Sequence, residues 1–117
     1  IEDNELDRRT IKSYFEKKGC AINSVETTEE ALEILKVATP KAILLDLDLK
    51  TSNIQGIELC KILKSRKEYQ HIPLIIITAV ILKSERGKLL ETTNADKLII
   101  KPIDQLADLD IILDYIA

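Results

Sequence analysis

Uninterrupted apolar runs alternate along the chain with segments in which apolar residues recur every three or four positions. The runs Ala42–Leu45 and Leu74–Ile77 contain no polar residue, which is typical of strands covered on both faces in a parallel sheet. A shorter run, Leu98–Ile100, predicts a strand of the same kind. Nearer the start, Cys20–Val25 predicts another short strand.

Five segments have the apolar spacing of amphipathic helices. The first starts near Leu6 and is stopped by Gly19, and the second opens on the capping-box pattern of Thr27 and Glu30. The other three begin near Gly56, Ser84 and Asp104. Strands that alternate with helices in this way predict an α/β fold, with right-handed crossovers and a parallel sheet between helices. We expect one domain over residues 1–117.

Composition narrows the class of protein further. Hydrophobic residues make up 45% of the chain and aromatic residues only 3%, which excludes disorder and predicts an aliphatic core. The net charge of -3 does not indicate the basic surface that nucleic-acid-binding proteins have, so we expect no direct contact with nucleic acid. No apolar run approaches the roughly 18 residues of a membrane span, and we expect a cytoplasmic protein. Cys20 and Cys60 lack metal-binding spacing and are expected to be reduced thiols.

Polar side chains stand where the three apolar strands end. Asp46 and Thr78 follow the two long runs, Lys101 follows the third, and the acidic pair Glu2 and Asp3 opens the chain. Because the carboxyl ends of parallel strands share one edge of a sheet, these side chains can converge. Carboxylates without His or Cys suit Mg²⁺, and a carboxylate beside Mg²⁺, Lys and a hydroxyl is suited to attack a phosphoryl group. Taken alone, Asp46 could equally be a strand cap.

With these pieces in this order, the chain resembles the receiver domain of two-component response regulators. The matching motifs are EDN at residues 2–4, ILLD at 43–46, IIITA at 75–79 and KP at 101–102. The resemblance spans essentially all 117 residues. It implies a flavodoxin-like fold, a doubly wound parallel sheet of five strands in the order 2-1-3-4-5 with helices on both faces.

The resemblance also implies roles for the acidic residues. Asp46 would be the phosphoacceptor, supplied by a histidine kinase or a histidine phosphotransfer protein. Asp3 would bind Mg²⁺ together with Asp46, Glu2 would assist, and Asp48 would offer its backbone carbonyl as a further ligand. Such a domain phosphorylates itself and dephosphorylates slowly, and it is not a turnover enzyme.

The remaining matches concern signal output. Thr78 and Lys101 match the switch hydroxyl and the lysine of the family, and the Lys101–Pro102 peptide would be cis. The signal would leave through the face of the fourth helix, fifth strand and fifth helix, roughly residues 84–117. The same face could support a homodimer.

Four departures from the family pattern stand out. The strand that should precede Glu2 is absent apart from Ile1, so we expect the natural protein to have at least about five more apolar residues before Ile1. The segment could come from a larger protein. Lys50 and Ile54 replace the usual Pro and Gly, and Gly56 lies ten residues after Asp46 (56 − 46 = 10), which indicates a two-residue insertion.

The third departure is Leu98, which stands where the family has Tyr or Phe. A leucine has no polar tip, so the usual aromatic response to phosphorylation is in question. The fourth departure is Asp48, whose carboxylate would favour a cation and disfavour a phosphoryl group, unless it points into solvent. Asp48, Val80 and Leu98 are therefore the positions expected to modulate the site.

Two alternatives remain open from the residues. The stretch Asp46–Thr51 also resembles the nucleophile motif of haloacid-dehalogenase-like phosphatases, in which Asp48 would be the general acid and base. That motif normally lies on the first strand, whereas here two helices and a strand precede it. The second alternative is an interaction module of receiver shape that carries no phosphate, but such a module has no physical need for the complete set of polar strand ends.

Overall fold

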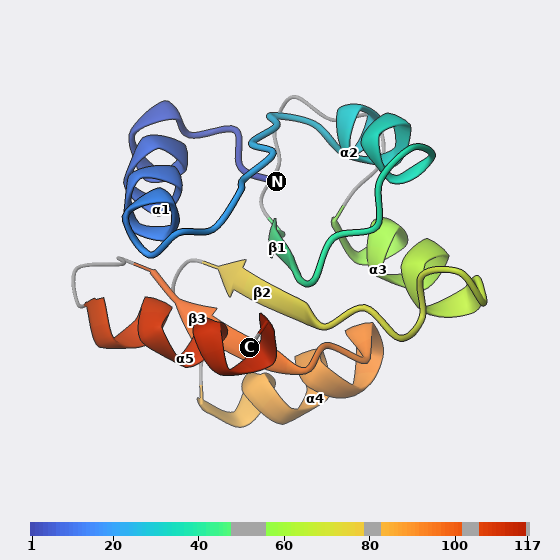
Figure 1. Ribbon diagram of the computed structural model, residues 1–117. Helices are drawn as coiled ribbons and strands as arrows, with labels where there is room; N and C mark the ends of the chain where they lie inside the picture. Colours follow the sequence, from blue (N-terminus) through green and yellow to red (C-terminus); the bar gives the residue numbers. More distant parts are fainter. Residues whose placement is uncertain (48–55, 79–82, 102–105, 117) are drawn as a thin grey trace.

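The structure, a computed structural model, describes residues 1–47, 56–78, 83–101 and 106–116 (Figure 1). Helices and strands alternate in the order α1 (Glu5–Lys17), α2 (Thr28–Leu35), β1 (Ile43–Asp46), α3 (Gly56–Ser65), β2 (Leu74–Thr78), α4 (Lys83–Thr93), β3 (Lys97–Ile100) and α5 (Leu106–Ile116). The five predicted helices and the three predicted apolar strands are confirmed. In the part of the chain described, no helix is long and apolar enough to cross a membrane.

The three strands form one parallel sheet in the order β1-β2-β3. Leu45 of β1 pairs with Ile76 of β2, and Ile76 pairs with Leu98 of β3. All three strands therefore end at the same edge of the sheet, as the sequence predicts. They correspond to the third, fourth and fifth strands of the expected order.

The predicted strand at Cys20–Val25 is wrong, because these residues carry no strand pairing in the structure. Its neighbour in the expected order would be the first strand, of which the chain contains only Ile1. A strand needs a partner to satisfy its backbone groups. One backbone bond of this kind is present, from Glu2 N to Val25 O at 3.0 Å. Within the described residues the sheet thus has three strands rather than five.

Ile1 lies beside β1 as one residue of a parallel strand would. Its amino group donates to Leu44 O at 2.6 Å, and Asp46 N donates to Ile1 O at 2.9 Å. The bond from Glu2 N to Val25 O then ties the next residue to the opposite side. These three bonds fix the start of the chain against the end of β1.

Alternate residues of the strands enter two separate cores, one on each face of the sheet (Figure 1). One core joins the sheet to α2 and α3, and the other joins it to α1 and α5. The buried members of the first are Ile43, Leu45, Leu59, Cys60, Leu63, Ile72, Leu74 and Ile76. Those of the second are Tyr14, Phe15, Ile75, Ile77, Ile99, Leu109 and Ile112. Burial on both faces explains why the strands are apolar without alternation.

Local signals in the sequence set the ends of the first two helices. Gly19 has a φ of +85°, the left-handed conformation that ends α1. Thr27 caps α2, since Glu30 N donates to Thr27 Oγ1 at 3.1 Å. That helix ends at Leu35. Both cysteines are free, as expected, and Cys60 is buried.

An apolar cavity of about 770 Å³ lies alongside β1, in line with Ile1. Its walls come from α1, α2, α5, the segment 20–25 and the outer side of β1. Apolar side chains dominate the lining and include Ile11, Phe15, Ile22, Ile34, Leu44 and Ile112. The cavity therefore occupies the space between β1, to which Ile1 is bonded, and the segment 20–25, to which Glu2 is bonded.

Candidate functional site

Asp46 ends β1 and places its carboxylate at the edge of the sheet where all three strands stop. Its side chain is only 3% exposed. The backbone N–H of Asp46 donates to Ile1 O. This bond ties the end of β1 to the start of the chain. A buried carboxylate at this position requires a compensating charge.

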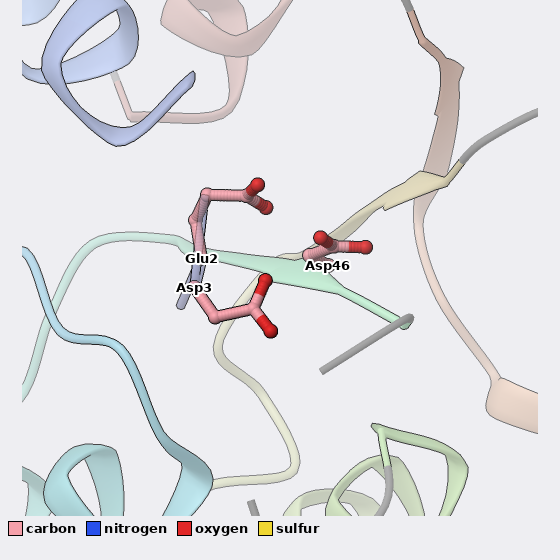
Figure 2. Close-up of side chains that lie close together, drawn as sticks. All are labelled: Glu2, Asp3 and Asp46. Atoms are coloured by element: carbon pink, nitrogen blue, oxygen red, sulfur yellow. The ribbon is translucent and has the colours of Figure 1, made fainter. Parts of the chain in front are cut away.

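Glu2 and Asp3 come from the turn before α1 and join Asp46 in one cluster. One carboxylate oxygen of each residue lies within 4.8 Å of the others, and Figure 2 shows the three side chains facing a common space. Glu2 is 4% exposed, whereas Asp3 is half-buried. Arg8 Nη1 donates to Glu2 O at 2.9 Å, which secures the turn from α1. The convergence expected from the strand ends is therefore observed.

Lys101 supplies the compensating charge from the end of β3. Its Nζ lies 2.8 Å from Glu2 Oε1 and 2.9 Å from Asp46 Oδ2. Its backbone N–H donates to Thr78 O at 2.7 Å, which continues the pairing of β2 with β3. The ammonium thus bridges the chain start and β1 across the end of β2.

The protonation of these groups reflects both burial and their neighbours. Burial, and then a hydrogen bond shared with Asp46, raise the pKa of Glu2 from 4.5 to about 7, against the opposing effect of Lys101. Burial alone would lower the pKa of Lys101. The hydrogen bonds and negative charges of Glu2 and Asp46 outweigh burial and hold the pKa of Lys101 above its usual value. Lys101 is therefore a fixed positive charge.

Thr78 ends β2 beside this cluster and is 8% exposed. It lies one position beyond Ile77, the register partner of Asp46. The three predicted strand ends are thus all at one edge, with a hydroxyl on the strand next to β1.

The donor set fits a hard divalent cation. Glu2, Asp3 and Asp46 offer only carboxylate oxygens, the ligands that Mg²⁺ prefers. Three carboxylates against one ammonium leave excess negative charge, which a cation would offset. The arrangement combines a buried carboxylate, an acidic cluster that could hold a metal ion and a fixed ammonium, the parts that phosphoryl transfer needs.

Several predicted positions are placed differently or not described. Asp48, Val80, Pro102 and the insertion after Asp46 lie outside the described residues, so their predicted roles stay predictions. Leu98 lies on β3, half-buried, and packs against the core on the α2 and α3 face. A branched aliphatic side chain in this position is suited to packing and offers no hydrogen-bonding group.

Sequence reasoning missed Asp7. Its Oδ2 lies 3.2 Å from Lys101 Nζ, so a third carboxylate pairs with the same ammonium. The sequence signal was only an acidic residue in the first turn of a helix, which is common. Its contact depends on how α1 sits against the sheet, and that orientation cannot be read from spacing.

The chain matches the family model for the response regulator receiver domain over residues 1–112. The polar-differentiation response regulator DivK of Brucella ovis is 29% identical over 116 residues, which cover 99% of this chain and 92% of that protein. The DivK of Brucella anthropi is similar to the same extent.

Solved structures agree on the fold. The signal receiver domain of a signal transduction histidine kinase from Syntrophus aciditrophicus has a TM-score of 0.85 and 24% identity, covering 99% of this chain and 86% of that one. The receiver domain of a sensor histidine kinase from Pseudomonas aeruginosa, with magnesium coordinated in its active site cleft, has a TM-score of 0.82 and 23% identity. The match covers 97% of this chain and 90% of that one. At these identities the likeness shows a flavodoxin-like receiver fold.

Proposed function

The chain belongs to the response regulator receiver domain family, and from this we propose that Asp46 accepts a phosphoryl group from a phosphohistidine. The donor would be a histidine kinase or a histidine phosphotransfer protein. One observation carries the proposal: Glu2, Asp3 and Lys101 converge on the buried carboxylate of Asp46. This is the surrounding that an attacking carboxylate needs.

In the proposed reaction, an Asp46 carboxylate oxygen attacks phosphorus and the bond from phosphorus to the donor imidazole nitrogen breaks. The electron pair of that bond goes to the imidazole. Lys101 offsets negative charge on the phosphoryl oxygens, and the Thr78 hydroxyl donates a hydrogen bond to one of them. These interactions stabilise the negative charge on the phosphoryl oxygens in this buried site, and this stabilisation makes the transfer feasible.

Glu2, Asp3 and Asp46 would hold Mg²⁺, with the backbone carbonyl of Asp48 as a proposed further ligand. Bound Mg²⁺ would supply positive charge to the transferring phosphoryl oxygens. The side chains of Asp48, Val80 and Leu98 are proposed to set the phosphoryl lifetime. Support for the proposed Mg²⁺ site comes from the carboxylate donor set and from the magnesium in the Pseudomonas aeruginosa receiver domain.

We place the output on the face of α4, β3 and α5, by analogy with the family. Lys101 directly follows β3, so a change in its contacts at the site acts on the strand that belongs to this face. Leu98 of β3 would take the place of the aromatic residue that relatives use. Homodimerisation through the same face is part of the proposal. The domain would be a switch with slow self-dephosphorylation and not a turnover enzyme.

The test is phosphorylation by acetyl phosphate with Mg²⁺, comparing the wild type with Asp46→Asn. We expect an acid-stable, hydroxylamine-sensitive adduct on the wild type and none on the variant. Equal labelling of both proteins, or of neither, would overturn the proposal. Turnover of a phosphate monoester at enzymatic rates would instead favour the phosphatase reading of Asp46 and Asp48.

A further inference from the structure

Lys101 pairs with a third carboxylate that the proposed reaction does not use. Asp7 Oδ2 lies 3.2 Å from Lys101 Nζ, on the side of the ammonium that faces α1. Asp7 is held in place locally, because its backbone N–H donates to the side chain of Asn4, the N-cap of α1, at 3.0 Å. The carboxylate is therefore presented to Lys101 by a capped helix end.

Three carboxylates therefore pair with one ammonium, and Asp3 adds a fourth carboxylate near Glu2 and Asp46. Glu2, Asp3 and Asp46 belong to the proposed metal cluster, whereas Asp7 approaches the site through its ion pair with Lys101. A phosphoryl group on Asp46 would add further negative charge and would need hydrogen bonds from the same ammonium. Asp7 and a phosphoryl group therefore compete for Lys101 and repel each other.

We propose that Asp7 is a positioning residue that holds Lys101 toward α1 and so disfavours the phosphorylated state of Asp46. The inference depends on the proposed function, because it describes how readily that site takes a phosphoryl group. Asp7 acts through Lys101 and forms no bond to the reacting atoms. Its side chain is 34% exposed, so solvent screens the pair and the effect is moderate.

The charge of Asp7 has opposite consequences for the two proposed ligands of the site, Mg²⁺ and the phosphoryl group. It attracts a cation to the carboxylate cluster and repels an anionic phosphoryl group. Loss of this charge should therefore weaken binding of Mg²⁺ and strengthen binding of a phosphoryl analogue. A residue that served only to stabilise the fold would weaken both on removal.

The competing explanation is that Asp7 only stabilises the start of α1 through the helix dipole. Glu5 offers a matched control, since it lies in the same first turn and carries the same charge. Its carboxylate pairs with a different cation, Arg9 Nη2 at 2.6 Å, and is 64% exposed. Glu5→Gln removes one negative charge from the same turn and leaves the lysine contact intact.

The experiment compares the wild type, Asp7→Asn and Glu5→Gln in two titrations. The first uses Mg²⁺ alone. The second uses beryllofluoride at saturating Mg²⁺, because this ion bonds to a carboxylate in the shape of a phosphoryl group. For Asp7→Asn we expect an Mg²⁺ affinity about two- to fivefold weaker and a beryllofluoride affinity about two- to fivefold tighter, the range of a partly exposed ion pair. Glu5→Gln should change neither.

The results separate this inference from the proposed function. A wild type that takes neither beryllofluoride nor a phosphoryl group would overturn the proposed function itself. If the wild type binds beryllofluoride but Asp7→Asn weakens both ligands, or behaves like Glu5→Gln, the positioning role of Asp7 is wrong while the function stands. Opposite shifts in Asp7→Asn alone would establish it.

Discussion

Lys101 Nζ lies 2.9 Å from Asp46 Oδ2, although β2 stands between the strands that these two residues end. The ammonium therefore reaches across the end of β2 from β3 to β1. Both residues are largely removed from water, with side chains 19% and 3% exposed. This ion pair is the connection through which charge at the site can act on β3 and its neighbours.

The first prediction concerns removal of this ammonium by Lys101→Met. Glu2 and Asp46 would then be buried acids that have lost their ion pair with Lys101, so we expect the free energy of unfolding without metal to fall by about 2–3 kcal/mol. Mg²⁺ should restore part of the loss, because it can replace the missing charge. Urea unfolding with and without Mg²⁺ measures both effects.

Lys36→Met is the control for Lys101→Met. Lys36 pairs with Glu33 at 2.8 Å on the exposed surface of α2 and its C-cap, where both side chains are more than 60% exposed. Its removal should change the free energy of unfolding by no more than about 0.5 kcal/mol. Equal losses of unfolding free energy in the two variants would show that the buried ion pairs of Lys101 stabilise the fold no more than the exposed pair of Lys36.

The second prediction concerns the contact between Gly56 and the site strand. A Cβ at Gly56, the first residue of α3, would lie 2.9 Å from Leu47 Cα, and Leu47 directly follows Asp46. Gly56→Ala should therefore lower the free energy of unfolding by about 1–3 kcal/mol through overpacking. Gly87→Ala in α4 meets nothing within 4 Å and should raise it by about 0.5–1 kcal/mol. Thermal unfolding of both variants decides, and a shared sign would contradict the steric argument.

These two glycines show what the sequence could and could not predict. The cost of Gly87 inside a helix follows from propensity alone, whereas the close approach of Gly56 to Leu47 depends on how α3 meets β1. The same division holds at the site. Asp46, Thr78 and Lys101 were predictable because apolar runs mark parallel strands, and parallel strands share one edge. The contact of Asp7 with Lys101 was not, because it depends on the placement of α1.

The failed strand at Cys20–Val25 has a related cause. Its residues have strand-like composition, but a strand is stabilised by its neighbour, and the start of the chain supplies one backbone bond in that direction, from Glu2 N to Val25 O. The alternation of elements, the capping of α2 and the end of α1 at Gly19 are local and were predicted correctly. Pairing between distant segments was predictable only where both strands are complete.

The third prediction is the pH dependence of stability that comes from Glu2. Its pKa is raised to about 7 in the folded protein from 4.5, so the folded state binds its proton more tightly than the unfolded state. The contribution of Glu2 to stability is therefore present below about pH 4.5 and is lost as pH rises through about 7. Without metal, the wild type should lose up to about 3 kcal/mol relative to Glu2→Gln between pH 5 and pH 8.

The comparison with Glu2→Gln is needed because another buried group titrates in the same range. Burial lowers the pKa of the Ile1 amino group to about 6, which makes stability rise with pH and opposes the effect of Glu2. Both proteins contain this amino group, so its own titration is largely removed from their difference, which then reports mainly on Glu2 and its interaction with the amino group. A difference in unfolding free energy that stays constant from pH 5 to pH 8 would contradict a raised pKa of Glu2.

The fourth prediction concerns the apolar cavity beside β1. An extension of five aliphatic residues before Ile1 would continue the pairing that Ile1 makes with Leu44 and Asp46, and would fill the 770 Å³ between α1, α2 and β1. It would also replace the buried amino group with a peptide bond. Burial of aliphatic side chains outweighs the ordering of the chain, and we expect a gain of about 2–4 kcal/mol in the free energy of unfolding.

An extension of five Gly and Ser residues is the control for this design. It removes the same terminal charge but brings no apolar side chains into the cavity, so it should give only a small part of the gain. The aliphatic extension should also protect the Val25 segment from hydrogen exchange, because a neighbouring strand would then be available for pairing. Urea unfolding and hydrogen exchange measure the two effects. Equal stabilisation by both extensions would show that the buried amino group, and not the unfilled apolar space, limits the stability of this fold.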